Sequence, residues 1–436
     1  MMTYKDARDY IDASVKYGNE LGLTAIMELL RRLDNPQDKL KVIHVAGTNG
    51  KGSTTAFIAS MLAAQGYKVG RYISPAVFNY LERVQITTKT MTGMTTVLMS
   101  EDGVSAAIER IKPICDQMLL EGLKHPTTFE IETVMAILYL YQEQVDFAII
   151  EVGLGGRLDA TNVFAKPLCC VITSISLDHM EFLGDTLDKI AKEKAGIIKK
   201  GSSVVTGNTH KEILKVLEET CKEKGAELIL TSPLEIDKVN YLSERTAFAY
   251  QQEEYSIHML GEYQVSNAAL AIQTVLQLRK LGIFITQEAI KAGLLEAYWS
   301  GRFEILRKDP FFIIDGAHNA DAALQLKNTI ERYFKDRRLI FILGVLADKD
   351  YHSILNQTAS LADIIYTITP KNTRGLASTQ LAIEAKKYCN GLVFDADNVE
   401  NAVKLAYKNA EREDVILAFG SLSYLGEVRE QLLCSK

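Results

Sequence analysis

The chain has 436 residues, of which 47% are hydrophobic and 24% are charged, and its formal net charge is −6. This composition is close to the globular average and excludes wholesale disorder. The acidic balance disfavours nonspecific nucleic-acid binding, which needs a basic surface, although a few lysines and arginines can still hold anionic small substrates. No apolar run approaches the roughly 18 residues of a membrane span, and the acidic N-terminus resembles no export signal. Six cysteines without a C-x-x-C motif favour reduced thiols in a cytoplasmic protein.

Short apolar strands and helices alternate along the first two thirds of the chain. Strands are predicted at 41–46, 69–74, 146–152, 168–175 and 202–206. Helices are predicted at 51–65, 104–121, 129–144, 186–195 and 210–224. Repeated β/α units of this kind predict a doubly wound α/β domain with a mainly parallel sheet. The polar residues 241–260 are predicted to form small antiparallel strands at a sheet edge, before a long helix at 262–280.

A second β/α series begins after a pause in the pattern at residues 298–302. Its strands are predicted at 311–314, 339–345, 363–369, 391–394 and 415–419. The helix that follows the first strand of this series has Ala323, Leu326, Ile330 and Tyr333 on one face. We expect two α/β domains, residues 1–297 and a smaller Rossmann-like domain at 298–436, and the cleft between two such domains is a common ligand site.

A glycine-rich loop joins the first strand to the next helix and is the strongest functional signal. Glycines let backbone N–H groups turn inward around phosphate oxygens, the helix N-terminus adds partial positive charge, and Lys51 can reach the terminal phosphates. The strict P-loop spacing is not met, because Val45 and Gly52 stand where Gly and Ser or Thr would be needed. A plain glycine turn would not explain a lysine at a helix start, where the dipole disfavours a cation. The predicted phosphate-binding residues are Gly47, Thr48, Asn49, Gly50, Lys51, Gly52 and Ser53.

Glu151 lies at the carboxyl end of the predicted strand 146–152, and His179 follows the next strand at an equivalent place, where functional groups of parallel sheets gather. Beside a phosphate loop, a carboxylate and an imidazole can complete a Mg²⁺ coordination sphere with phosphate oxygens and water. The residues alone leave open a structural interpretation, in which Glu151 is a capping carboxylate and His179 is a loop histidine with its hydrogen bonds satisfied.

The loop Gly-Thr-Asn-Gly-Lys-Gly-Ser-Thr resembles the phosphate loop of the folylpolyglutamate synthase and dihydrofolate synthase family, within the wider Mur ligase group. Other segments match this family in order along nearly the whole chain: Ser74-Pro75, Glu82-Arg83, Thr128-Phe129-Glu130, 151–162, Leu177-Asp178-His179, Glu193-Lys194, Tyr263-Gln264, Gly301-Arg302, 315–319 and Asp348-Lys349-Asp350. The resemblance implies an ATP-binding first domain and a C-terminal glutamate-ligase domain. It implies an ATP-dependent ligase that adds L-glutamate to a folate carboxylate through an acyl phosphate, releasing ADP and phosphate.

The resemblance also implies a metal site and a modified lysine. Ser74, Glu151 and His179 would hold Mg²⁺ ions that bridge the phosphates of ATP. The lysine equivalent to Lys194 is often carbamylated in this family, which converts a cation into an anion. Without the family, Lys194 would be interpreted as a solvated helix charge; carbamylation needs a neutral amine, which burial favours.

Nucleotide and amino-acid contacts are implied further along the chain. Asn267 offers a donor and an acceptor to an adenine edge, with helix capping as the alternative. Arg302, at the domain junction, would stabilise charge that develops during phosphoryl transfer. Asp315 and His318 would contact the nucleotide and the reacting groups, and His318 would assist deprotonation of the amine. Ser421 is a candidate for holding the incoming glutamate, with a turn serine as the alternative.

A pterin-containing substrate is expected against the glycine-rich loop 153–159, for which the alternative is a flexible surface loop. The candidate substrate contacts are Phe78, Arg83, Phe129, Gly155, Arg157, Asp159 and Ser421. The two phenylalanines are equally good core residues. The motifs do not separate a reduced folate from dihydropteroate as acceptor, and Ala76 and Leu81 depart from the family pattern near the expected pocket.

Two other functions share part of this pattern. A cell-wall Mur ligase has the same loop and carboxylate activation, but the loop begins by residue 47 and leaves no clear preceding domain for a nucleotide-linked peptide. A non-catalytic nucleotide-binding module needs neither the metal ligands nor the junction arginine. We therefore expect ATP and Mg²⁺ as cofactors, small-molecule substrates, no nucleic-acid or membrane partner, and a monomer.

Overall fold

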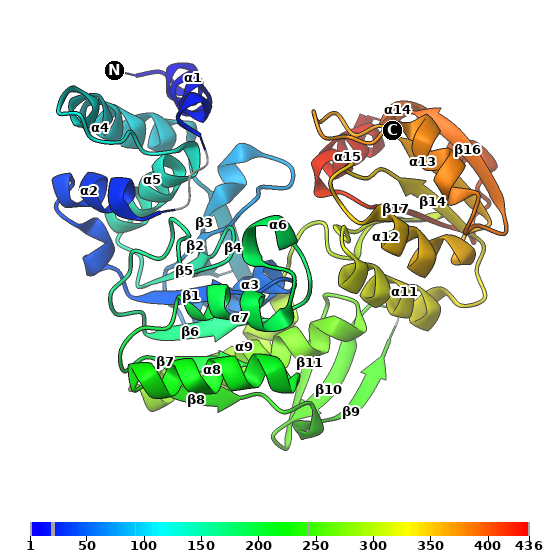
Figure 1. The fold of residues 1–436 in the computed structure, drawn as a ribbon. Helices are drawn as coiled ribbons and strands as arrows, with labels where there is room; N and C mark the ends of the chain where they lie inside the picture. Colours follow the sequence, from blue (N-terminus) through cyan, green and yellow to red (C-terminus); the bar gives the residue numbers. More distant parts are fainter. Residues whose placement is uncertain (1, 19–21, 92, 243, 435–436) are drawn as a thin grey trace.

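The computed structural model describes residues 2–18, 22–91, 93–242 and 244–434. Within these ranges the N-terminal part (α1 to α10) contains an eight-stranded sheet of order β4-β3-β2-β5-β1-β6-β7-β8. The C-terminal part (β12 to α15) contains a six-stranded sheet of order β12-β13-β17-β14-β15-β16. The two parts lie side by side, the C-terminal part in yellow to red at the right of Figure 1.

The large sheet is parallel except at one edge. Its strands are β1 (Val42–Ala46), β2 (Val69–Tyr72), β3 (Val84–Thr90), β4 (Gly93–Leu98), β5 (Phe147–Glu151), β6 (Cys169–Ile172), β7 (Ser203–Thr206) and β8 (Glu227–Leu230). Every residue of β1 and β5 is buried, as expected for parallel strands covered on both faces. Strand β3 pairs antiparallel with β2 and β4, so that a hairpin forms the edge. Strands β1, β5 and β6 are parallel neighbours, so their carboxyl ends lie together at one end of the strands, where ligand sites of open α/β sheets form.

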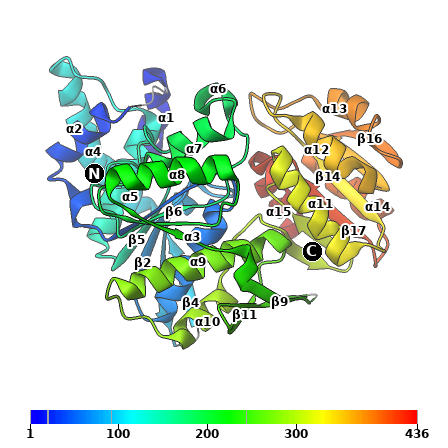
Figure 2. The same cartoon turned by 60° about the horizontal axis from the view of Figure 1, so that its bottom comes forward.

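Helices cover both faces of this sheet because alternate strand residues point to opposite sides. Ile43 and Val45 pack with α3, α9 and α10, whereas Val42 packs with α1, α2, α4 and α5. Helices α7 and α8 extend this second layer, opposite α9 in Figure 2. The helices are α1 (Tyr4–Ala13), α2 (Thr24–Arg32), α3 (Lys51–Ala64), α4 (Glu101–Leu120), α5 (Thr128–Gln142), α6 (Met180–Leu183), α7 (Leu187–Ala195), α8 (Lys211–Lys224), α9 (Glu262–Lys280) and α10 (Gln287–Glu296).

The C-terminal part is a smaller α/β unit with its own two-sided core. Its strands are β12 (Glu304–Lys308), β13 (Phe311–Ile314), β14 (Leu339–Leu343), β15 (Ile364–Ile368), β16 (Leu392–Asp397) and β17 (Val415–Phe419). Its helices are α11 (Ala320–Phe334), α12 (Tyr351–Thr358), α13 (Ser378–Ala385), α14 (Val399–Asn409) and α15 (Leu425–Cys434). The predicted α/β class, with a large mainly parallel sheet and a second smaller α/β unit, is confirmed.

The predicted elements agree with the structure best where the apolar pattern is strong, and α9, β13 and β17 have the predicted bounds. The placement of residues 241–260 at the edge of the large sheet is wrong. Strands β9 (Ile236–Tyr241), β10 (Thr246–Tyr250) and β11 (Glu253–Ile257) are antiparallel, but they form a separate three-stranded sheet. Its buried face packs with α9 and α10, which satisfies its apolar side chains without the large sheet. The proposed domain boundary near residue 298 falls between α10 and β12 and stays a prediction.

Cys115, Cys169, Cys170 and Cys221 are buried free thiols, and Cys389 is a partly buried free thiol. Among the described residues, no helix combines the length and the apolar composition that crossing a membrane requires.

Candidate active site

The phosphate loop connects β1 to α3 at the carboxyl edge of the large sheet. Gly47 and Gly50 adopt φ angles of 153° and 84°, which residues other than glycine rarely adopt. A Cβ atom on Gly47 would lie 1.7 Å from the Oγ1 of Thr173, so the neighbouring strand also requires glycine there. Lys51 is the first residue of α3, and the amide end of this helix faces the loop.

The side chain of Lys51 turns back into the loop. Its Nζ donates to the carbonyl oxygens of Gly47 and Thr48, both at 3.1 Å. Burial lowers the pKa of Lys51, and the nearby Glu151 carboxylate opposes this shift. The ammonium group thus occupies the cradle in which phosphate oxygens would be stronger partners than neutral carbonyls.

Hydrogen bonds from neighbouring segments hold the loop in shape. Thr48 accepts from the backbone N–H of Ser176 and donates to its carbonyl oxygen, each at 3.1 Å. Ser53 accepts from Gln264 Nε2 at 3.2 Å, and Gln264 in turn accepts from Asn267 Nδ2 at 3.0 Å. Asn267 also lines a cavity of about 500 Å³ beside the loop, between α9 and the segment after β6. A ligand on the loop can therefore continue into this cavity.

Glu151, the last residue of β5, is only 6% exposed. Burial raises its pKa to about 7, while the positive charges of Lys51, Arg302 and Arg71 act in the opposite direction. Ser74, after β2, has a buried Oγ without a hydrogen-bond partner among the described residues. A buried carboxylate and an orphaned hydroxyl are both oxygen ligands that could satisfy a hard cation.

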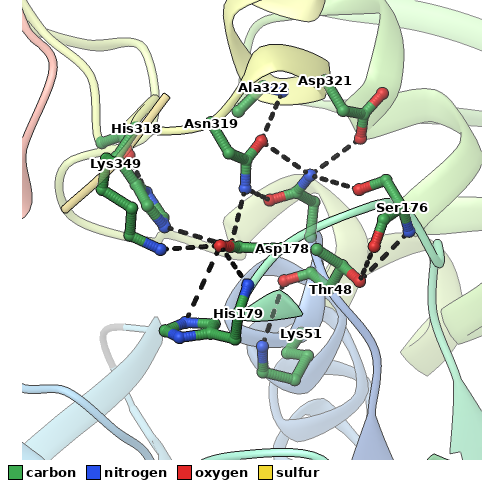
Figure 3. Close-up of polar contacts among 12 residues, drawn as sticks. Thr48, Lys51, Ser176, Asp178, His179, His318, Asn319, Asp321, Ala322 and Lys349 are labelled. Atoms are coloured by element: carbon green, nitrogen blue, oxygen red, sulfur yellow. Dashed lines mark hydrogen bonds and ion pairs between the residues drawn. The ribbon is translucent and has the colours of Figure 1, made fainter. Parts of the chain in front are cut away.

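Asp178, in the loop after β6, is the centre of a polar cluster between the two parts of the protein (Figure 3). Its carboxylate accepts from Lys349 Nζ at 2.6 Å, from Asn319 Nδ2 at 3.1 Å and from the backbone N–H of His179 at 2.9 Å. The imidazoles of His179 and His318 each lie 3.9 Å from it. Despite burial, the hydrogen bond and charge of Lys349 hold the pKa of Asp178 well below its usual range.

A second link joins the phosphate loop itself to the C-terminal part. Asn49 Nδ2 donates to Asp321 Oδ2 at 2.7 Å, and Asn319 Nδ2 donates to Asn49 Oδ1 at 3.2 Å. Asn319 also caps α11 by accepting from the backbone N–H of Ala322 at 2.9 Å. The loop and the start of α11 are thus held together by side chains shown in Figure 3.

The two predicted catalytic histidines, His179 and His318, both lie in this cluster. His179 has a left-handed backbone with φ 50°, and its imidazole faces Asp178. His318 hydrogen-bonds through Nδ1 to the carbonyl oxygen of Gly316 at 2.8 Å, and burial lowers its pKa to about 4. Such a weak base captures a proton poorly at neutral pH. Throughout the described ranges, no group of three or more His, Cys, Asp and Glu forms a potential metal cluster.

Lys194 is buried, with 4% exposure, and the alternative of a solvated helix charge is wrong. Its Nζ donates to the carbonyl oxygen of Gly47 at 2.8 Å, the same oxygen that accepts from Lys51. Burial lowers the pKa of Lys194 to about 7, and the charge of Lys51 adds to this effect. A substantial fraction of this amine is therefore neutral at physiological pH.

Arg302 lies at the junction between the two parts. A Cβ atom on Gly316 would come within 2.3 Å of its Nη1, so glycine is needed for this approach. The positive charge of Arg302 lowers the pKa of both Glu151 and Asp315 against the effect of burial. Asp315 accepts hydrogen bonds through both carboxylate oxygens, from the backbone N–H groups of Phe303 at 2.7 Å and Ala317 at 2.8 Å. These bonds fix the backbone of the junction.

A cavity of about 390 Å³ is lined by the predicted metal ligand Ser74 and by three predicted substrate residues, Arg83, Phe129 and Asp159. Arg83 pairs with Glu132 at 3.2 Å, and its Nε and Nη1 are buried without partners among the described residues. Asp159 accepts from the backbone N–H of Leu154 at 2.8 Å and thereby shapes the glycine-rich loop. The cavity combines an aromatic wall with unsatisfied cationic donors.

The remaining substrate candidates lie outside the lining of this cavity. Phe78 packs against the core of the C-terminal part and under the guanidinium of Arg429, 4.8 Å from the ring centre. Arg157 pairs with Glu193 at 3.0 Å, and Gly155, with φ 67°, lies beside Leu183 and Glu193. Ser421 caps a turn by accepting from the backbone N–H of Ser423 at 3.2 Å. The structure supports a structural role for Phe78 and Ser421.

Two family models match the chain, the Mur ligase middle domain at residues 45–275 and the glutamate ligase domain of Mur ligases at residues 301–422. The dihydrofolate synthase/folylpolyglutamate synthase of Bacillus subtilis is 34% identical over 98% of this chain and 99% of its own length. The chain belongs to this family of Mur ligases. The corresponding Escherichia coli protein is 33% identical over 94% of this chain and 91% of its own length.

Solved structures of family members share the whole fold. A Mycobacterium tuberculosis folylpolyglutamate synthase, complexed with ADP and AMPPCP, has a TM-score of 0.87 at 28% identity, with 99% of each chain covered. E. coli FolC in complex with DHPP and ADP has a TM-score of 0.84 at 31% identity, with 98% of each chain covered. The phosphate loop described above thus belongs to a fold whose members bind adenine nucleotides.

Several residues that organise the ligase site were not predicted as site residues. Asp178, Asn319 and Lys349 stand inside segments that match the family, but nothing in their spacing indicates that they meet. Asp321 and Gln264 have ordinary helical contexts. The signal that could have found them is their place at the carboxyl ends of apolar strands. Asp178 and Asn319 both follow such a strand, and Glu151 ends one.

Proposed function

We propose that this protein is an ATP-dependent ligase that joins L-glutamate to a folate carboxylate, as a folylpolyglutamate synthase with or without dihydrofolate synthase activity. A carboxylate is a poor acylating agent, so ATP first converts it to an acyl phosphate, and the α-amine of glutamate then displaces phosphate. The observation that carries this proposal is the phosphate loop of a Mur ligase, with Lys51 close enough to the buried Glu151 for each charge to shift the other's pKa.

ATP would place its phosphates on the loop and its nucleoside in the cavity of about 500 Å³ that Asn267 lines. Lys51 would exchange its bonds to the Gly47 and Thr48 carbonyl oxygens for phosphate oxygens. Arg302 would offset, with its fixed charge, the negative charge on the transferring phosphoryl group. No nucleophilic side chain is required, because positioning and charge neutralisation suffice for this chemistry.

Mg²⁺ would be held by Glu151 and the orphaned Ser74 hydroxyl, together with phosphate oxygens and water. It would supply positive charge against the phosphates. His179 would be a third ligand through its imidazole, which lies 3.9 Å from the Asp178 carboxylate and makes no side-chain hydrogen bond to it.

Lys194 is proposed to carry a carbamate formed from CO₂, with loss of one proton from the amine. Its burial and its pKa of about 7 support this proposal, because only a neutral amine attacks CO₂. Enzyme equilibrated with ¹³C-labelled CO₂ should show a carbamate carbon resonance that is missing in Lys194→Arg. Spectra without a Lys194-dependent resonance would exclude the modification.

The folate would enter the cavity of about 390 Å³, its ring against Phe129 and an anionic group at the unsatisfied nitrogens of Arg83. Glutamate would bind across the junction, near His318. We further propose the domain division at residues 297 and 298, a monomeric state and a cytoplasmic location.

The test of the function is ADP release in the presence of Mg²⁺ and L-glutamate, with dihydropteroate or tetrahydrofolate as acceptor. Turnover with at least one acceptor, dependent on glutamate, is expected. The ratio between the two acceptors separates dihydrofolate synthase from folylpolyglutamate synthase activity. ATP binding without ADP release in every combination would refute the ligase function, and turnover only with a nucleotide-linked peptide would indicate a cell-wall ligase.

A further inference from the structure

A cavity of about 360 Å³ lies between the hairpin β3–β4, the strand β2 and the segment that follows α10. It shares no lining residue with the proposed folate cavity. Ile73 and Glu82 line this cavity, whereas their neighbours Ser74 and Arg83 line the other, so the two cavities are separated by the same two segments, which follow β2 and precede β3. None of the roles proposed above uses this space.

The floor of the cavity carries a buried positive charge. Arg71 is 4% exposed and donates from Nη2 to the Oε1 of Gln85 at 2.5 Å. Its Nε is buried and has no hydrogen-bond partner within the described ranges. Burial lowers the pKa of Arg71 to about 10, and the Glu151 carboxylate acts in the opposite direction. A buried guanidinium with an unpartnered Nε–H is a group that a carboxylate would satisfy.

Two carboxylates stand at the wall and the mouth of the same cavity. Glu82 accepts through Oε2 from the backbone N–H groups of Val77 and Phe78, both at 3.1 Å. Glu296 accepts through Oε2 from the backbone N–H of Met94 at 3.1 Å. Each carboxylate is thereby fixed in place by one oxygen, and the negative charge of each remains available to a cation.

The rest of the lining is divided between apolar and exposed residues. Ile73, Met94, Leu98 and the ring of Trp299 provide apolar surface, and the guanidinium of Arg71 lies 5.4 Å from the centre of that ring. Thr96, Glu296 and Tyr298 are exposed at the mouth. The cavity is therefore open to solvent, with a cation at its floor, anions nearer the mouth and an apolar wall.

We propose that this cavity binds a free α-amino acid with an apolar side chain. The carboxylate would meet Arg71, the ammonium group would meet Glu82 and Glu296, and the side chain would lie against Trp299. A simple carboxylate would satisfy the floor but face two uncompensated anions, so the zwitterion matches the charges of the lining better. This site is separate from the site near His318 at which the proposed ligase reaction would bind its glutamate substrate.

An occupant would be sensed at the phosphate loop. A Cβ atom on Gly52 would lie 2.6 Å from three atoms of the Trp299 ring, so the indole packs directly on the first turn of α3. This contact explains why glycine follows Lys51 where the strict P-loop has Ser or Thr. A ligand that shifts the indole therefore changes the packing of the loop that would hold ATP.

Trp299 is the single tryptophan of the chain, and its indole lines this cavity, so its fluorescence reports on an occupant. The indole also borders a second cavity beside Arg302, so the variants described below are needed to locate the binding. The probes are L-leucine, 4-methylpentanoate, which lacks the ammonium group, and 3-methylbutylamine, which lacks the carboxylate. Without nucleotide, L-leucine is expected to change the emission saturably, and each analogue is expected to bind at least tenfold more weakly. Absence of a saturable change with L-leucine, or equal affinity for the three probes, would overturn the proposal.

Two variants locate the binding. Arg71→Gln is expected to abolish the L-leucine response, and Glu296→Gln to weaken it about tenfold while leaving ADP release unchanged. Glu296 is exposed, and glutamine can still accept from Met94, so this variant remains informative if Arg71→Gln fails to fold. A response that both variants retain would place the ligand elsewhere. Because the titration needs no nucleotide or folate, its outcome is independent of the ligase assay.

Discussion

The ion pair between Asp178 and Lys349 provides a direct test of how the two parts of the protein are held together. Both side chains are nearly buried, with exposures of 10% and 13%, and their charged atoms lie 2.6 Å apart. Asp178→Asn keeps the size of the side chain but removes the charge, which leaves the Lys349 ammonium buried without its counterion. Lys349→Met removes the ammonium group and keeps most of the apolar stem.

The expected magnitude follows from the contacts that each change removes. Removing one partner of a buried ion pair costs about 3 kcal/mol, because the remaining charge stays desolvated. The double variant loses the pair but leaves no orphaned charge, so it should be less destabilised than the sum of the single variants. A charge-assisted hydrogen bond contributes about 1.5–3 kcal/mol, and we expect a coupling energy near 2 kcal/mol between Asp178 and Lys349.

The assay is denaturant unfolding of the wild type, both single variants and the double variant. The matched control is the cycle for Arg412 and Asp309, whose charged atoms lie 3.3 Å apart with both side chains exposed. Exposed pairs contribute less than about 1 kcal/mol, so this cycle should give a small coupling. A coupling for Asp178 and Lys349 no larger than that of the control pair would refute the reasoning.

Four further outcomes are expected. Since the pKa of Asp178 is lowered on folding, its contribution to stability is present above about pH 4 and is lost as pH falls below that value; an acid titration in which Asp178→Asn follows the wild-type profile would contradict this. Lys51→Ala should lower kcat by about 10²–10³ with little change in unfolding free energy, and near-normal turnover would remove Lys51 from the phosphate site. Glu151→Ala should shift the Mg²⁺ dependence of ADP release, more than His179→Ala does; an unchanged magnesium titration would return Glu151 to a structural role. Gly47→Ala should destabilise the protein by about 1–3 kcal/mol and weaken ADP binding, because its Cβ would overlap Thr173. Gly22→Ala, where a Cβ meets nothing within 4 Å and which lies outside the lining of the proposed nucleotide cavity, should change neither property. Equal effects of the two substitutions would show that the loop tolerates a side chain.

The strands and helices with strong apolar patterns were predictable because the pattern and the burial have the same cause. β13 and β17 are short apolar runs in a covered sheet, and α9 has the predicted bounds. The hairpin β3–β4 escaped prediction because no residue of β4 is buried, so β4 is defined by its pairing with β3 rather than by an apolar pattern. The strands within residues 241–260 were expected at the edge of another sheet because the sequence does not indicate which strands pair. They pair with one another and pack on α9 and α10.

The sequence by itself determined the phosphate loop, since its glycines and Lys51 are contiguous and their conformational needs are local. It also determined the family, because matching segments recur in order over nearly the whole chain. Only the tertiary structure decided that Asp178 meets Lys349, 171 residues away, that Lys194 is buried against Gly47, and that Arg71 forms the floor of a cavity. These contacts join segments distant in the chain, and their charges acquire strength only after folding removes the water around them.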